Sequence, residues 1–227
     1  MVYLALLLLV LAAIFLPQVW VQRVLARHNR EPEPNFPGTG GELARHLLTR
    51  LGLDDDKVES TEIGDHYDPI SRCVRLTKDK FDGRTLTAIT VAAHECGHAM
   101  QHAGNEPMFQ LRSRLAASAV WATRLGSFLI FAAPMLALIG RAPSPALLSV
   151  LGGFLIMGFG VVVQLLTLPV ELDASFRKAL PMLEAGYLET NQVPAARQIL
   201  RAAAWTYVAA SLASLLNFWR WMAILRR

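Results

Sequence analysis

Disulfide frameworks and nucleic-acid motifs are both missing from this 227-residue sequence. Its two cysteines, Cys73 and Cys96, are too few for the network of bridges that holds small secreted domains together, and they fit a reducing compartment. The net charge is +4, but basic residues are scattered beside acidic ones and form no basic helix face or motif of basic and aromatic residues. We therefore expect no nucleic-acid partner.

Charge is scarce as well. Charged residues make up 18% of the chain and hydrophobic residues 53%, above the roughly 45–50% of soluble domains. The stretch from Tyr3 to Val21 is uncharged and, at about 1.5 Å per residue, long enough to span a hydrocarbon core of about 30 Å. Only Met1 and Val2 precede it, so the positive n-region of a cleavable signal peptide is absent. We predict a retained transmembrane anchor over residues 1–22.

Three further apolar blocks follow in the second half of the chain. Leu115–Gly140 and Ala146–Val170 are each long enough to cross a bilayer, and the short link between them holds two prolines, which predicts a transmembrane hairpin over residues 115–170. Ala202–Trp219 is uncharged but less hydrophobic. We expect a membrane-associated helix over residues 202–227 that either spans the bilayer or lies in its interface, giving three to four transmembrane helices in all.

The remaining segments predict a mixed α and β domain. Residues 31–41 read EPEPNFPGTGG, a spacer rich in proline and glycine inside a linker over residues 23–41. Thr39 and Glu42 then have the spacing of a capping box, ahead of a short amphipathic helix that stops at Gly52. A cytoplasmic domain over residues 42–114 starts with this helix.

Two strands and a second helix complete that domain. Polar and apolar residues alternate over 58–63 and 72–77, on either side of the turn-forming pair Asp68-Pro69, which predicts two short strands paired as a hairpin. The second helix should begin near Thr85 and end at Gly104.

The strongest motif lies in this second helix, where His94-Glu95-Cys96-Gly97-His98 is an HExxH sequence. On a helix its histidines share one face, about 6 Å apart along the axis, so both imidazoles can reach one zinc ion at about 2.1 Å. Glu95 points to the side of that pair, where it can take a proton from zinc-activated water and pass it to the leaving amine. The motif predicts one Zn²⁺ per chain on His94 and His98, with Glu95 as the catalytic carboxylate.

A third metal ligand must come from elsewhere in the chain. Glu171 is the best candidate, because it follows directly on the second helix of the hairpin, which returns it to the side of the histidines. Asp173, two residues on, ranks lower as an orienting group. His102 continues the histidine face, but it lies about 12 Å along a straight helix from His94 and cannot share its metal.

The runs DHYDPISRCVRLT, AAHECGHAMQH, LPVELDAS and AAAWTYVAA, in this order over nearly the whole chain, resemble the neutral zinc metallopeptidases of the YugP type. The layout is also similar to the HtpX-type membrane peptidases, whose third ligand begins an E-x-x-A-D pattern. Glu171 and Ala174 fit that pattern, whereas Ser175 replaces its aspartate, so the orienting group would be Ser175 or Asp173. The resemblance implies that the strand 72–77 offers its edge to an extended substrate.

Arginines place the domain relative to the membrane. Arg23, Arg27 and Arg30 follow the anchor and none precedes it, so the positive-inside rule predicts that the catalytic domain faces the cytoplasm in a multi-pass protein of the cell membrane. Residues 171–201, the third-ligand helix and a cytoplasmic segment, lie on the same side. Because Glu171 abuts the apolar block, the metal should lie near the lipid bilayer, where juxtamembrane protein segments become plausible substrates.

The predicted fold is an α+β membrane protein, with a zincin-like helical metallopeptidase domain, a small β-hairpin and three to four transmembrane helices. The predicted function is that of a zinc-dependent metalloendopeptidase of the gluzincin type, acting on membrane-associated protein or peptide substrates. A zinc-containing membrane scaffold or adaptor without turnover is the alternative from another class. The candidates for the oxyanion donor are Arg177, His66, Tyr187 and Tyr207, among which the sequence does not choose, and it does not predict the oligomeric state.

Overall fold

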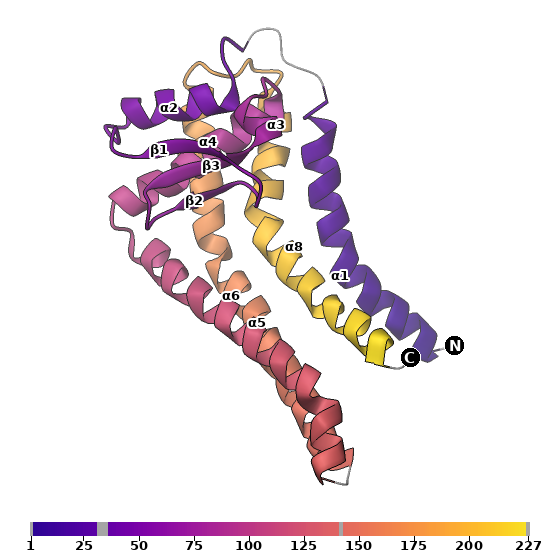
Figure 1. Cartoon of the computed structure of the whole chain (residues 1–227). Coiled ribbons are helices and arrows are strands. Elements are labelled where there is room, and N and C mark those ends of the chain that lie inside the picture. Colours follow the sequence, from indigo (N-terminus) through magenta and orange to yellow (C-terminus); the bar gives the residue numbers. More distant parts are fainter. Residues whose placement is uncertain (1, 31–35, 141–142, 226–227) are drawn as a thin grey trace. The chain divides into compact units, whose positions relative to one another are not determined.

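The computed structural model describes residues 2–30, 36–140 and 143–225, and the chain divides into two compact units (Figure 1). The helical unit comprises Met1–Gln18, Leu111–Leu168 and Tyr207–Arg227. The mixed unit comprises Val19–Gln110 and Pro169–Thr206. Residues 31–35 of the predicted spacer and residues 141–142 of the predicted hairpin link lie outside the described residues.

The helical unit is built from four long helices, each of which also contributes residues to the mixed unit. They are α1 (Val2–Arg27), α5 (Pro107–Gly140), α6 (Pro143–Asp173) and α8 (Val193–Leu225). Within the helical unit α5 and α6 pack against each other. The hydroxyl of Ser149 donates to the backbone carbonyl of Leu129 on α5. Gly153 lies so close to α5 that a Cβ there would come within 2.8 Å of the Gly126 carbonyl oxygen.

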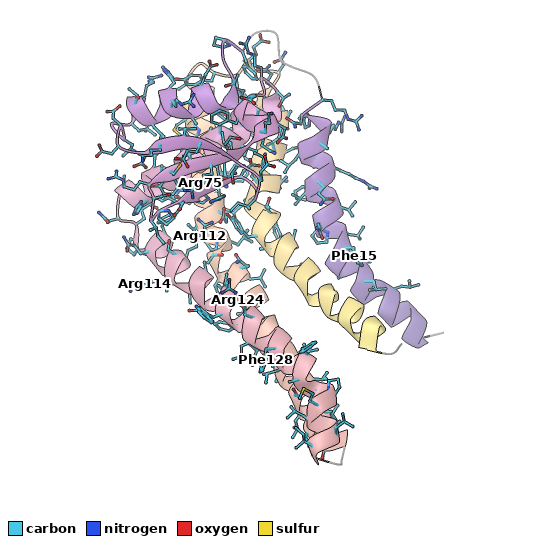
Figure 2. The ribbon with its side chains drawn as sticks, in the orientation of Figure 1. Phe15, Arg75, Arg112, Arg114, Arg124 and Phe128 are labelled. Carbon is cyan, nitrogen blue, oxygen red and sulfur yellow. The ribbon has the colours of Figure 1, made fainter. Side chains whose placement is uncertain are left out.

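Helix α5 is the one helix among the described residues that is long and apolar enough to cross a membrane. Its large apolar side chains Trp121 and Phe128 are exposed, and Figure 2 labels Phe128 and Arg124, which both project outward from the helix. The Arg124 guanidinium lies over the Trp121 ring, 5.6 Å from its centroid. The other predicted spans stay predictions.

The mixed unit contains the shorter elements. They are α2 (Gly40–Arg50), β1 (Lys57–Thr61), β2 (His66–Asp68), β3 (Cys73–Thr77), α3 (Lys78–Phe81), α4 (Leu86–Ala103), the π-helix η1 (Ala174–Ala179) and α7 (Leu180–Glu184). The predicted capping box of α2 is confirmed, because the Thr39 hydroxyl accepts from the Glu42 backbone N–H at 3.2 Å and the Glu42 carboxylate accepts from the Thr39 N–H at 2.7 Å. The structure is thus mostly helical, with one small sheet.

The sheet has the order β1-β3-β2, with β3 at its centre. β1 pairs with β3 in parallel and β2 pairs with β3 in antiparallel fashion. Both predicted strands are present, but the prediction that they form a hairpin with each other is wrong. The Asp68-Pro69 turn joins β3 to the short strand β2, which pairs with β3 in antiparallel fashion on one side, while β1 pairs with β3 in parallel on the other.

Helix α4 forms the core of the mixed unit. Its predicted ends are confirmed, because the Thr85 hydroxyl accepts from the Ala88 N–H at 3.1 Å and the helix stops at Gly104. Every residue from Leu86 to Ala99 is buried, as expected for a helix that is covered on all sides. The end of α1 also contacts its first turn, since the Thr87 hydroxyl donates to the Leu25 carbonyl at 2.9 Å.

Candidate metal centre

Three potential metal ligands meet inside the mixed unit. His94 and His98, one turn apart on α4, place their ring centroids 4.8 Å from each other. The Nε2 atoms of His94 and His98 lie 3.4 and 3.1 Å from the same oxygen, Oε2 of Glu171. All three residues are buried, and their ligand atoms lie within 4.8 Å of one another. The structure thus brings together the two histidines and the glutamate that the sequence predicted.

A close helix contact allows Glu171 to reach the histidines. Glu171 lies near the end of α6, and η1 follows it directly along α4. A Cβ on Gly97 would come within 2.7 Å of the Ala174 carbonyl oxygen, so the two backbones can approach this closely only because position 97 has no side chain. The glycine of the HECGH motif therefore sets the distance between the two helices that carry the ligands.

The tautomer of His94 follows from the bonds of Ser175, which is fully buried on η1. The Ser175 hydroxyl donates to the backbone carbonyl of Leu200 at 3.1 Å, and this carbonyl can only accept. The same hydroxyl oxygen lies 3.0 Å from His94 Nδ1 and, with its one hydrogen used, must accept there. In its neutral form His94 therefore carries its proton on Nδ1, and Nε2 faces Glu171 with a lone pair.

The tautomer of His98 follows in the same way from Gln101. The Gln101 amide nitrogen donates to the Val170 carbonyl and to Asp173 Oδ2, each at 2.9 Å, and both partners can only accept. The amide oxygen therefore faces His98 Nδ1, 2.9 Å away, and accepts its hydrogen. In its neutral form His98 thus also presents a lone pair on Nε2. Each histidine thus has its own orienting group, Ser175 for His94 and, through Gln101, Asp173 for His98.

This arrangement fits a bound cation. Two unprotonated imidazole nitrogens and a carboxylate oxygen direct lone pairs at one another in a buried space, and a positive charge between them removes the repulsion. Imidazole and carboxylate are the ligand types of catalytic zinc sites, in which three protein ligands leave one position open. The chemistry of the ligands therefore fits zinc.

Sequence comparisons agree with this chemistry. The sequence model of the family described as "putative neutral zinc metallopeptidase" matches residues 3–226. The chain belongs to this family of zinc metallopeptidases. A curated relative, "Putative membrane protease YugP" of Bacillus subtilis (strain 168), is 36% identical over 195 residues, which are 82% of this chain and 80% of that protein. No solved structure matches the chain.

Zinc is accordingly the metal of this family member, and His94, His98 and Glu171 form a buried group that could bind one ion. Glu95 follows His94 on α4 and is buried as well, at 5% exposure. It does not belong to the three-residue cluster. At about 100° per residue it points to the side of the face that His94 and His98 share.

His102 lies one turn beyond His98 and belongs to a second polar network of the mixed unit. Its Nδ1 lies 2.9 Å from the Tyr67 hydroxyl, which donates to Asp56 at 2.9 Å. Arg72 closes the network with a bond of 2.7 Å to the same carboxylate. Burial and the bond to Asp56 raise the pKa of Tyr67 above its usual range, so the hydroxyl keeps its proton. The sequence did not reveal this network, because Tyr67 and Asp56 have no fixed spacing from α4.

The oxyanion candidates lie in four different places. Arg177 is exposed and pairs with Asp173, and the Tyr187 hydroxyl accepts from Arg50 at 3.1 Å. Tyr207 belongs to the helical unit, where its ring lies beneath Arg112. His66 lies on β2, with its Nδ1 2.8 Å from the Gly64 carbonyl. These contacts do not favour any one of the four as the oxyanion donor.

The predicted substrate edge at residues 72–77 is wrong, because β3 is the central strand and pairs on both sides. Its last residue is covered as well, since the Asp65 carboxylate accepts from both the backbone N–H and the hydroxyl of Thr77, at 2.7 and 2.9 Å. β2 has β3 on one side only and therefore forms one edge of the sheet. Tyr67 on β2 contacts His102 on α4, so this edge lies beside the helix that carries the histidines.

Gln101 is a further site residue that was not predicted from the sequence. It stands three residues after His98, close enough on a helix for the two side chains to meet. This spacing could have indicated an orienting group. What the spacing cannot reveal is the direction of the amide, which depends on Val170 and Asp173, about 70 residues away in the chain.

Proposed function

We propose that this chain is a membrane-bound zinc metallopeptidase that hydrolyses peptide bonds of membrane-associated proteins, with Glu95 as general base and general acid. The convergence of His94, His98 and Glu171 in one buried cluster is the observation that supports it. When bound there, Zn²⁺ lowers the pKa of water to about 7 and polarises a carbonyl group. We assign one zinc ion per chain to this cluster.

The chain's own residues supply the remaining chemistry. Ser175 and Gln101 hold the histidines in the tautomer that presents Nε2. Glu95 takes a proton from the attacking water and delivers it to the amide nitrogen as the peptide bond breaks. The burial of the cluster keeps bulk water from competing for the reacting groups.

The substrate binds in extended form along β2. The strand has β3 on one side only, so backbone groups on its other side can pair with a peptide by strand addition. The contact of Tyr67 with His102 places this edge next to the turn of α4 that follows His98. A peptide there would run past the metal cluster.

The membrane assignment rests on the name of the relative and on the apolar helix α5. We propose a multi-pass protein of the cell membrane with the segments given above: an anchor at 1–22, a hairpin at 115–170 and a membrane-associated helix at 202–227. The arginines after the anchor favour a catalytic domain in the cytoplasm. Juxtamembrane protein segments would then be within reach of the site.

Detergent-purified wild type and Glu95→Gln test this proposal when zinc content and cleavage of casein are measured side by side. Glu184→Gln, which removes an exposed carboxylate of the mixed unit, is the matched control. We expect about one zinc per chain in all three and a rate at least 100-fold lower in Glu95→Gln alone. If Glu95→Gln cleaves as fast as wild type, the assigned mechanism is wrong. If none of them cleaves casein, a membrane protein or itself, the scaffold function is favoured.

A further inference from the structure

A chain of polar contacts leads from His98 to a lysine that the mechanism does not use. Gln101 bonds His98 and Asp173, and Asp173 in turn forms an ion pair with Lys178. The Lys178 ammonium also lies 2.8 Å from Oε1 of Glu106. With 12% of its side chain exposed, Lys178 is nearly buried between these two carboxylates.

We propose that Lys178 is a positioning residue of the metal centre, which fixes the tautomer of His98 through Asp173 and Gln101. The inference rests on the proposed role of His98 as a metal ligand. Lys178 pairs with Asp173 and Glu106, so it acts on His98 through its neighbours.

The π-helix makes this pairing possible. Asp173 and Lys178 are five residues apart, a separation that places side chains about 140° from each other on an α-helix. In η1 the backbone is wound more widely, with hydrogen bonds that span five residues, so positions 173 and 178 come to the same side. The wide turn thus brings a buried cation to the carboxylate that holds Gln101.

The direction of the Gln101 amide depends on Asp173 staying in place. Asp173 has a second cation nearby, Arg177, whose guanidinium lies 3.8 Å away and whose side chain is 84% exposed. Without Lys178, this exposed arginine would draw the carboxylate toward solvent. Gln101 would then lose one of the two acceptors that fix its amide nitrogen.

A reversed amide would change the metal site. It would present N–H groups to Nδ1 of His98, which could then only accept, and the imidazole would carry its proton on Nε2. An Nε2 with a proton cannot bind zinc. Lys178 therefore favours the one amide direction in which His98 is a ligand.

Lys178 also links the segment that precedes α5 to the segment that follows α6. Glu106 directly precedes α5, and Lys178 lies in the π-helix that directly follows α6. The ion pair thus ties together the residues where the chain leaves the mixed unit and where it returns.

Zinc affinity of the full-length chain in detergent tests this inference by competition with a chromophoric chelator. Removal of residues that orient a metal-binding histidine typically weakens metal binding by about 10- to 100-fold, and we expect about tenfold for Lys178→Met. Arg177→Met is the matched control, because it removes the other cation beside Asp173, and we expect a change below about twofold. Lys178→Arg should recover most of the affinity.

A double substitution shows whether Lys178 acts through Asp173. In a chain that already carries Asp173→Asn, Lys178→Met should cause no further loss of zinc affinity, whereas a general effect on folding would add to the first. If Lys178→Met does not fold, Lys178→Gln carries the same expectations.

The outcomes separate the inference from the proposed function. Wild-type affinity in Lys178→Met, or an equal loss in Arg177→Met, overturns the role of Lys178 while the zinc site stands. Equal losses from Lys178→Met with and without Asp173→Asn also overturn it. A wild-type chain that binds no zinc overturns the proposed function and this inference together.

Discussion

Ser175→Ala probes the orienting role of a hydroxyl at the metal centre. The hydroxyl serves two buried groups, since it accepts from Nδ1 of His94 at 3.0 Å and donates to the Leu200 carbonyl at 3.1 Å. Alanine serves neither. The Leu200 carbonyl keeps its backbone bond inside helix α8, whereas the buried Nδ1–H of His94 loses its acceptor. Such a loss costs about 1–3 kcal/mol, and the free energy of unfolding should fall by about this amount.

Two assays measure these effects separately. For a chain of this size about 1 kcal/mol corresponds to roughly 2–4 °C, so thermal unfolding of the metal-free protein should show a midpoint about 2–12 °C lower. Chelator competition should show zinc affinity about 10- to 100-fold lower, because His94 loses the group that fixes its tautomer.

A second serine provides the control. The Ser118 hydroxyl is exposed and donates to the Arg114 carbonyl of its own helix at 3.3 Å, so Ser118→Ala should change the free energy of unfolding by less than about 0.5 kcal/mol. Wild-type zinc affinity in Ser175→Ala would refute the tautomer argument. If Ser118→Ala lost as much stability as Ser175→Ala, the loss in Ser175→Ala could not be attributed to a buried polar group that has lost its partner.

Three further predictions concern packing, acid and thiols. Gly97→Ala would push the π-helix away from α4 and should weaken zinc binding by about tenfold, whereas Gly152→Ala, where a Cβ meets nothing within 4 Å, should not. Burial opposes ionisation of Asp68, but hydrogen bonds outweigh it and lower its pKa to about 2. The ionised Asp68 therefore stabilises the fold above about pH 4, and this stabilisation is lost as the pH falls toward 2. Between these pH values the free energy of unfolding should fall by about 1 kcal/mol on account of Asp68, after solvent screening. An equal fall in Asp68→Asn would contradict this. Burial raises the pKa of Cys73 to about 11 and that of Cys96 as well, so neither should react with a thiol reagent at pH 8 before unfolding.

The parts of the fold that the sequence predicts correctly depend on neighbours in the chain. Thr39 with Glu42 and Thr85 with Gly104 mark helix ends through contacts within a few residues, and the structure has those ends. The pairing of the strands depends on distant partners. The turn at Asp68 was recognised, but β2, only three residues long, shows too little alternation to be seen.

The same division holds for the site. Two histidines four residues apart are neighbours on any α-helix, so their shared face could be predicted from spacing alone. The position of Glu171 beside the histidines could be predicted only from the hairpin, which returns the chain to their side. The pairing of Asp173 with Lys178 could not be predicted, because it depends on a π-helix, whose wider turn brings residues five apart together.

The most direct test of the account is the zinc content of Glu171→Gln, because this residue joins the returning helix to the histidines. The full-length chain would be purified in detergent, equilibrated with limiting free zinc and assayed for bound metal beside wild type and Glu184→Gln. We predict about one zinc per chain in wild type and in Glu184→Gln, and a loss of most of the zinc in Glu171→Gln. Full zinc occupancy in Glu171→Gln would contradict the proposed metal centre.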